Sequence, residues 1–133
     1  MRALILALLL MGAQPAVAGE PLPGAEVPPP GFSDPVWTTG QDLVTDCQHA
    51  SGDLQGHCDF EVLMGVVQLR QAEPGKLCAP KPAGDMSQQD SDRWFHDRIE
   101  QPVYDWIAAR PDALARPWGE SVGMAALALW PCS

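Results

Sequence analysis

The sequence predicts an all-α domain, a small bundle of four to five helices stapled by two disulfides. Two observations lead to this fold class. Apolar residues recur at steps of three and four along several segments, and no segment shows the period-two alternation expected of a half-buried strand. Four cysteines without C-x-x-C spacing, in a chain that begins like an exported protein, predict disulfides rather than a zinc or redox site.

The N-terminus predicts export. Residues 1–18 combine a positive charge at Arg2, an apolar run and the small-residue motif "AVA", which is the layout of a secretory signal peptide. The apolar run is shorter than the roughly 20 residues that a membrane-spanning helix needs, so we expect no membrane insertion. We therefore expect a periplasmic protein with a proline-rich, flexible lead-in over 19–33 and a helical domain over 34–133.

The first helix is predicted in "TTGQDLVTDCQHA". Thr38 or Thr39 suits the N-cap, and Leu43, Val44 and Cys47 share one apolar face.

The second helix is predicted in "HCDFEVLMGVVQLRQA", after a turn in "SGDLQG". Cys58, Val62 and Val66 are among the residues of its apolar stripe, and the "EPG" at 73–75 ends it. Gly65, in mid-helix, costs about 1 kcal/mol relative to alanine. We expect another helix to approach closely there.

The third helix is predicted to start at a capping-box-like "SQQD", Ser87 to Asp90, and Pro102 is expected to break or kink it. The segment "VYDWIAAR" then continues as helix, and "RPDALARP" is a connection with about one helical turn. The residues expected to face inward in this region are Trp94, Phe95, Ile99, Val103, Trp106 and Ile107.

The last helix is expected to carry Pro117 in its first turn and to end at Pro131. Its predicted buried face is Trp118, Val122, Ala125, Ala126 and Leu129. Most of the five tryptophans are expected in the core.

The motif "GESVG" at 119–123 matches the G-x-S-x-G spacing of a serine-hydrolase nucleophile elbow. That elbow needs a strand before the serine and a helix after it. Ser121 instead lies one turn into a predicted helix, so we interpret the match as coincidence and expect no enzyme activity.

The cysteines allow three pairings. We favour Cys47–Cys58 and Cys78–Cys132, because the first pair lies on or beside two helices joined by a short turn. On the chain-entropy model the local bridge contributes roughly 3 kcal/mol and the long one about 4 kcal/mol.

The chain is acidic, with 17 Asp and Glu against 8 Lys and Arg. This charge argues against nucleic acid as a partner and is compatible with a basic protein partner or simply with solubility.

The histidines are His49, His57 and His96. A metal site at His57 with Asp46, Asp53 and Asp59 lacks ligand spacing on a helix, so we expect solvent-facing histidines, no metal and no cofactor. No carboxylate pair stands out for acid–base chemistry.

Taken in order, these elements resemble the Rap/Tai family of immunity proteins against type VI secretion amidase effectors. The matching residues are "TGQDLVTDCQ", the second cysteine followed by "VLMGVVQ", then "KLCAP", "VYDWIAARPDALARP" and "ALALWPC". The resemblance covers about 95 residues, nearly all of the predicted domain.

The resemblance implies a periplasmic helical protein, often a homodimer, that binds a peptidoglycan amidase and blocks its cysteine–histidine groove. The polar segments Ala79 to Asp90 and Arg110 to Arg116 are the expected contacts. The candidate contact residues are Asp85, Arg110, Asp112 and Arg116.

Two other functions fit the size, acidity and expected export of the chain. One is a small acid-activated periplasmic chaperone, and the other is an orphan helical domain that binds a different protein. Fold alone does not choose among these functions.

Overall fold

The computed structural model describes residues 35–133, so the predicted signal peptide (1–18) and lead-in (19–33) lie outside the described residues. The predicted all-α class is confirmed. The elements are α1 (Gly40–Cys47), α2 (Gly52–Ala72), α3 (Gln88–Phe95), the π-helical segment η1 (His96–Glu100), α4 (Gln101–Ala108), α5 (Pro111–Ala115) and α6 (Trp118–Leu129). Because α3, η1 and α4 follow without a break, the described chain forms five helical rods.

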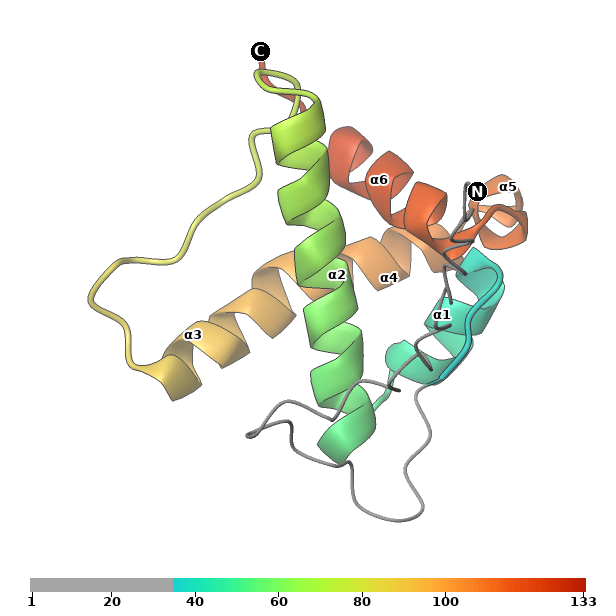
Figure 1. Cartoon of the computed structure of the whole chain (residues 1–133), viewed down its shortest axis with the longest axis horizontal. Coiled ribbons are helices and arrows are strands. Elements are labelled where there is room, and N and C mark those ends of the chain that lie inside the picture. Colours follow the sequence, from blue (N-terminus) through green and yellow to red (C-terminus); the bar gives the residue numbers. More distant parts are fainter. Residues whose placement is uncertain (1–34) are drawn as a thin grey trace, which may run out of the picture. The chain divides into compact units, whose positions relative to one another are not determined.

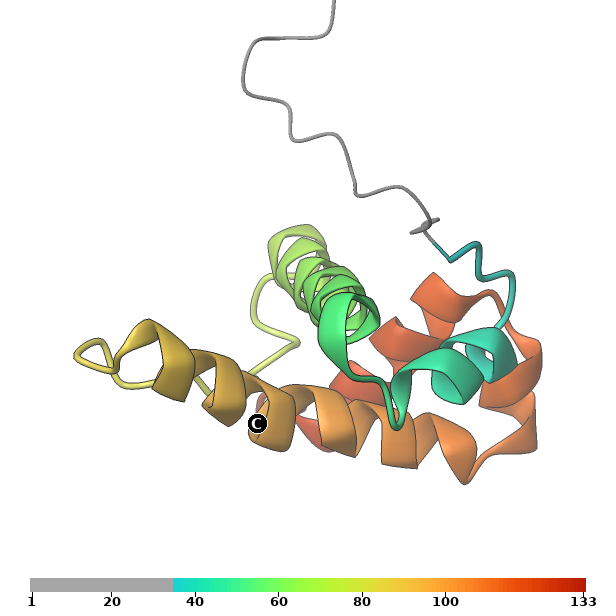
Figure 2. The same cartoon turned by 90° about the horizontal axis from the view of Figure 1, so that it is seen from below.

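The rods pack around α6, which contacts α1, α2, α4 and α5. In Figure 1, α2 crosses in front of the α3–η1–α4 rod, and α1 and α5 lie toward the α4 end of that rod. Figure 2 shows the same rod from below as one continuous run of helix. Between residues 35 and 133 there is no β-strand, only two isolated antiparallel bridges, Thr39–Pro117 and Leu77–Pro131.

Helix α1 has Thr39 as its N-cap, one of the two threonines predicted for that position. The Thr39 hydroxyl accepts from the Asp42 backbone N–H, and Asp42 Oδ2 accepts from the Thr39 N–H at 2.9 Å. This reciprocal pair is a capping box, which satisfies two of the N–H groups that a helix start leaves without partners. Leu43, Val44 and Cys47 are all buried, which confirms the predicted face.

Helix α2 begins earlier than predicted. The expected turn in "SGDLQG" is wrong, because residues 52–56 belong to the helix. The helix starts at Gly52, whose φ of 62° lies in the left-handed region. Leu54 packs against the core, and a Cβ on Gly56 would meet nothing within 4 Å, so this glycine only lowers helix propensity. Tertiary contact outweighs the turn-like composition.

The predicted close approach at Gly65 is confirmed. A Cβ built on Gly65 would lie 3.2 Å from Cγ1 of Val122, a buried residue of α6. The glycine therefore lets α2 and α6 pack more tightly than an alanine would allow.

The third rod starts as predicted, since the Ser87 hydroxyl accepts from the Asp90 N–H at 3.1 Å. Of the break or kink expected at Pro102, the break does not occur, because the chain stays helical on both sides of it. Pro102 has no N–H, and its ring crowds the carbonyl four residues earlier in an α-helix. Here the turn before it is π-helical, with the Gln101 N–H bonded to the His96 carbonyl, and this wider turn accommodates the proline.

The core lies where α6 meets the other helices. Val122, Ala125 and Ala126 are fully buried, whereas Trp118 and Leu129 are half-buried at the edge of the core. The expectation that most tryptophans are core residues is only partly right. Trp37 is buried, and the other four are half-buried residues that pack against the core: Trp94, Trp106, Trp118 and Trp130.

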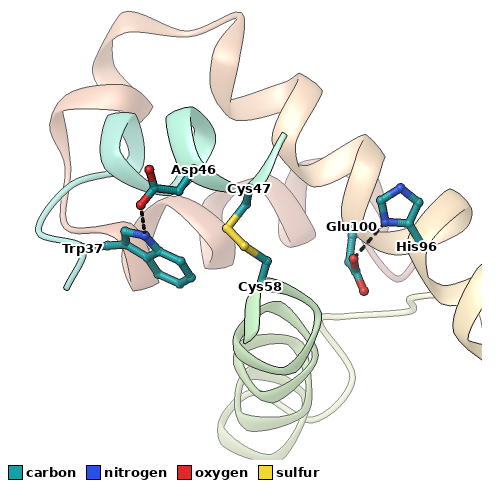
Figure 3. Close-up of a disulfide and its surroundings, with 6 residues drawn as sticks. All are labelled: Trp37, Asp46, Cys47, Cys58, His96 and Glu100. Atoms are coloured by element: carbon teal, nitrogen blue, oxygen red, sulfur yellow. Dashed lines mark hydrogen bonds and ion pairs between the residues drawn. A yellow bond between two sulfur atoms is a disulfide. The ribbon is translucent and has the colours of Figure 1, made fainter. Parts of the chain in front are cut away.

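Both predicted disulfides are confirmed. Cys47–Cys58 joins the end of α1 to α2, with Cα atoms 5.7 Å apart (Figure 3). Cys78–Cys132 joins the segment after α2 to the C-terminus, with Cα atoms 5.0 Å apart. All four cysteines are paired, and such bonds form and persist in oxidising surroundings such as the extracellular space or the periplasm.

Within residues 35–133, no helix is long and apolar enough to cross a membrane.

Candidate functional site

A cavity of about 310 Å³ lies between α2, the α3–η1 part of the third rod and the segment after Cys78. Its walls are mostly apolar, and Phe60 and Leu63 of α2 are 58% and 40% exposed at this surface. The apolar lining side chains include Phe60, Leu63, Val66, Val67, Trp94, Phe95 and Ile99. An apolar hollow with a few convergent polar groups is typical of a binding site.

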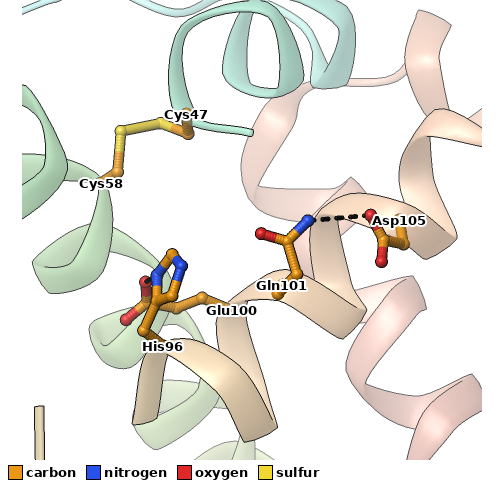
Figure 4. A network of polar contacts seen from close by, with 6 residues as sticks. All are labelled: Cys47, Cys58, His96, Glu100, Gln101 and Asp105. Atoms are coloured by element: carbon orange, nitrogen blue, oxygen red, sulfur yellow. Dashed lines mark hydrogen bonds and ion pairs between the residues drawn. A yellow bond between two sulfur atoms is a disulfide. The ribbon is translucent and has the colours of Figure 1, made fainter. Parts of the chain in front are cut away.

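The polar groups in this region come from two rods. Asp59 of α2 approaches His96 and Glu100 of η1. One carboxylate oxygen from each acid and one ring nitrogen of His96 all lie within 4.8 Å of one another. Nδ1 of His96 is 3.2 Å from Oε2 of Glu100 (Figure 4). Asp59 and Glu100 also line the cavity.

Glu100 is the central member of this group. It is fully buried, and its Oε1 has no hydrogen-bond partner among the described residues. Loss of hydration, followed by the neighbouring Asp59 carboxyl group and the charge of Asp92, raises the pKa of Glu100 to about 10. Burial disfavours the charged form of a carboxyl group, so at neutral pH this side chain is protonated in the absence of a cation.

Tyr104 lies one turn after Glu100 and is also fully buried. Its hydroxyl has no hydrogen-bond partner in the described part of the chain. Burial, with the charges of Glu100 and Asp59, raises the pKa of Tyr104 well above its usual value. Two buried polar atoms without partners in one neighbourhood are uncommon in folded proteins and call for an explanation.

Comparisons with protein families, curated proteins and solved structures find no match for this chain.

The histidine expectation needs correction. His49 is exposed, but His57 packs edge-on against Trp37 with ring centroids 5.2 Å apart, and His96 is half-buried beside Glu100. The cluster weighed from the sequence does not form, because within residues 35–133 the only group of three such side chains close enough to hold a metal is Asp59, His96 and Glu100. Asp46 instead accepts from Nε1 of Trp37 at 2.8 Å (Figure 3). Only Asp59 of that cluster reaches the polar site, and it does so with His96 rather than His57.

The carboxyl pair of Asp59 and Glu100 was not predicted from the sequence. One pattern carried the information: Glu100 precedes Val103, Tyr104 and Ile107 by three, four and seven positions, and all three are buried. An acidic residue at an inward position of an apolar stripe is a candidate functional group. Its partner Asp59 was out of reach, since it lies on another helix.

Ser121 is not an accessible nucleophile. It is fully buried in α6, and its Oγ donates to the carbonyl oxygen of Ala113 at 2.6 Å. No strand precedes it within the described residues, so the interpretation of "GESVG" as a coincidence agrees with its position.

The candidate contact residues lie in two separate places. Arg110, Asp112 and Arg116 gather at α5, whereas Asp85 lies in the segment between α2 and α3, on the other side of the domain in Figure 1. The guanidinium of Arg110 stacks over Trp106 at 4.0 Å, and Arg116 forms an exposed ion pair with Glu120 at 3.6 Å. A small partner surface therefore cannot touch both groups at once.

The segment around Asp85 is the most exposed continuous stretch of the described chain. Every residue from 80 to 90 is exposed. Its start is fixed by the Cys78–Cys132 disulfide and by the Cys78 N–H, which donates to the Trp130 carbonyl at 2.8 Å. Its end is fixed by the Ser87 cap of α3.

Proposed function

We propose that this chain is an exported, periplasmic immunity-type protein that binds and inhibits a peptidoglycan amidase effector of a type VI secretion system. In this proposal it is a binding protein, with no catalysis of its own. The observation that carries the proposal is the run of exposed residues from 80 to 90, anchored at both ends. A protruding, anchored segment suits an inhibitor that occupies the groove of an enzyme.

The physical argument is preorganisation. Pro80 and Pro82 fix two backbone φ angles within the segment, and the disulfide and helix cap hold its ends. A segment that is already ordered loses less conformational entropy when it binds, so more of the contact free energy appears as affinity.

Charge is the second support. The chain carries a formal net charge of −9, which would speed encounter with a basic enzyme. The predicted signal peptide supports a periplasmic location, where peptidoglycan lies. Arg110, Asp112 and Arg116, which gather at α5, are available for a different contact. We propose that they contribute to the homodimer that the family resemblance implies.

The test begins with the oxidised protein, purified after export and immobilised, with lysate of the source bacterium passed over it. Recovery of a cysteine–histidine amidase, whose cleavage of peptidoglycan cross-links stops on addition of the protein, is the expected result. Asp85→Lys should weaken inhibition at least about tenfold, which corresponds to about 1.4 kcal/mol. Asp53→Lys makes the same charge change at an exposed position of α2 and should leave inhibition within about twofold.

Two outcomes would contradict the proposal. Recovery of many unrelated envelope proteins, only at low pH, would identify a chaperone. Recovery of a single partner without amidase activity would identify an orphan binding domain.

A further inference from the structure

We propose that Asp59, His96 and Glu100 form a binding site for a divalent transition-metal cation such as Zn²⁺, in the wall of the cavity between α2 and the α3–η1–α4 rod. This inference is independent of the proposed amidase partner. It rests on the arrangement of the three donor groups and on the burial of Glu100.

The spacing of the donors fits a cation. Zinc binds imidazole nitrogen and carboxylate oxygen at about 2.0–2.2 Å, which places neighbouring ligand atoms of a tetrahedral site about 3.3 Å apart. His96 Nδ1 and Glu100 Oε2 are already 3.2 Å apart. The whole set lies within 4.8 Å, so the remaining approach is about 1.5 Å or less and lies within the reach of side-chain rotation.

Glu100 supplies a second and independent observation. Its side chain is fully buried, and its Oε1 has no hydrogen-bond partner among the described residues although the Asp59 carboxyl group lies nearby. A buried carboxylate needs a compensating positive charge or hydrogen bonds. A cation between Asp59 and Glu100 provides that charge for both groups.

The types of donor select the class of cation. One imidazole and two carboxylates suit zinc and similar first-row transition metals, whereas Mg²⁺ and Ca²⁺ favour oxygen ligands throughout. Three protein ligands leave a fourth position open, as in catalytic zinc sites. Because Asp59 and Glu100 line the cavity, we expect a small ligand to reach a bound cation from this hollow.

The place in the fold agrees with this role. His96 and Glu100 are the first and last residues of the π-helical segment, and π turns are frequent at functional sites. Asp59 follows Cys58, whose disulfide ties α2 to α1. A bound cation would tie α2 to the third rod as well, so binding should raise the thermal midpoint.

The experiment measures Zn²⁺ binding by titration calorimetry on the oxidised, metal-stripped protein purified after export. We expect one Zn²⁺ per chain with a dissociation constant below about 10 µM, and a rise in the thermal midpoint. Cysteine ligands do not interfere, because all four cysteines are in disulfides. Substitution of Co²⁺ gives an absorption spectrum that reports tetrahedral coordination directly.

His96→Ala should weaken Zn²⁺ binding at least about tenfold. The control is His49→Ala, which changes an exposed histidine outside α2 and η1 and should leave the affinity unchanged. Glu100→Gln keeps the size of the buried side chain and removes the charged ligand, so it should fold and lose binding. Absence of saturable binding by the folded wild-type protein up to about 0.1 mM would overturn the proposal. Equal affinities of the wild-type protein and the His96→Ala variant would also overturn it.

Discussion

Gly40 passes so close to Ser121 that a Cβ built on this glycine would lie 2.8 Å from the Ser121 Oγ. The same Cβ would lie 2.5 Å from the carbonyl oxygen of Ala113, the acceptor of the Ser121 hydrogen bond. The start of α1, the short helix α5 and the first turns of α6 therefore meet at one point that has no space for another atom.

Gly40→Ala should destabilise the fold. The backbone oxygen of Ala113 cannot rotate away, so α1 must move, and we expect a loss of about 1–3 kcal/mol in the free energy of unfolding. Urea denaturation measures this loss. Gly56→Ala is the control, because a Cβ there would meet nothing within 4 Å. Alanine in that helical position should stabilise the protein by about 0.5–1 kcal/mol. Equal effects of the two substitutions would contradict the close packing at Gly40.

Ser121→Ala should lower the free energy of unfolding, because the Ser121 hydroxyl has a structural role in the core. Removal of the hydroxyl takes away one of the two hydrogen bonds to the buried Ala113 carbonyl, which keeps the Arg116 N–H at 3.3 Å, and we expect a loss of about 0.5–1.5 kcal/mol. The hydroxyl is inaccessible, so the native protein should not react with fluorophosphonate probes of serine hydrolases. Labelling of Ser121 in the folded protein would contradict its burial.

Removal of the long disulfide by Cys78→Ser with Cys132→Ser should lower the free energy of unfolding by about 4 kcal/mol. This bond closes a loop of 54 residues, against 11 for Cys47–Cys58, and a longer loop gains more entropy in the unfolded state when the bond is lost. The Cys47→Ala, Cys58→Ala variant, without the shorter bridge, should lose about 3 kcal/mol on the same model. Denaturation of both variants under oxidising conditions tests which of the two losses in the free energy of unfolding is larger. A larger loss from the short bridge would show that native packing at the buried pair outweighs loop length.

The contribution of the Asp42 carboxylate to the α1 capping box should be lost in acid. Hydrogen bonds from the backbone N–H groups of Thr39 and Thr38 lower the pKa of Asp42 below its usual value of 3.8. A carboxyl group with a lowered pKa in the folded state stabilises the protein above its unfolded pKa. That stabilisation is lost as the pH falls through the folded pKa. The stability difference between wild type and Asp42→Ala should therefore be constant from about pH 5 to 7 and shrink below about pH 4.

Denaturation curves between pH 2.5 and 7 measure this difference. Gln41→Ala is the control, because the neighbouring Gln41 side chain does not titrate. Its stability difference from wild type should not change with pH. An Asp42→Ala difference that persists at pH 2.5 would contradict the role of the charged carboxylate.

Local residue patterns predicted much of the fold. The capping residue Ser87, the choice of Thr39 or Thr38 as the first N-cap and the favoured disulfide pairing came from spacing and residue type. A glycine in mid-helix suggested a close approach at Gly65 but could not show which helix approaches. The start of α2 did not, because two glycines and a serine near 51–56 have turn-like composition. Leu54, within this segment, packs against the core, and a contact with another part of the chain cannot be predicted from the composition of the segment itself.

The candidate site was harder to predict, for a related reason. Asp59 and Glu100 are far apart in the sequence and meet only because α2 crosses the third rod. The π turn that carries His96 and Glu100 also accommodates Pro102, which was expected to break or kink the helix. A polar residue on an inward helical face, such as Glu100, is nevertheless visible in a single sequence.

The bond between Cys78 and Cys132 has a consequence for proteolysis. Residues 80–87, all exposed, are the natural place for a protease to cut the described chain. The cut would fall inside the loop closed by this disulfide, so the two pieces would stay covalently joined. A nicked molecule would run as one species without reductant and as two fragments with it. The protein can thus lose a peptide bond in its most exposed segment without losing either half.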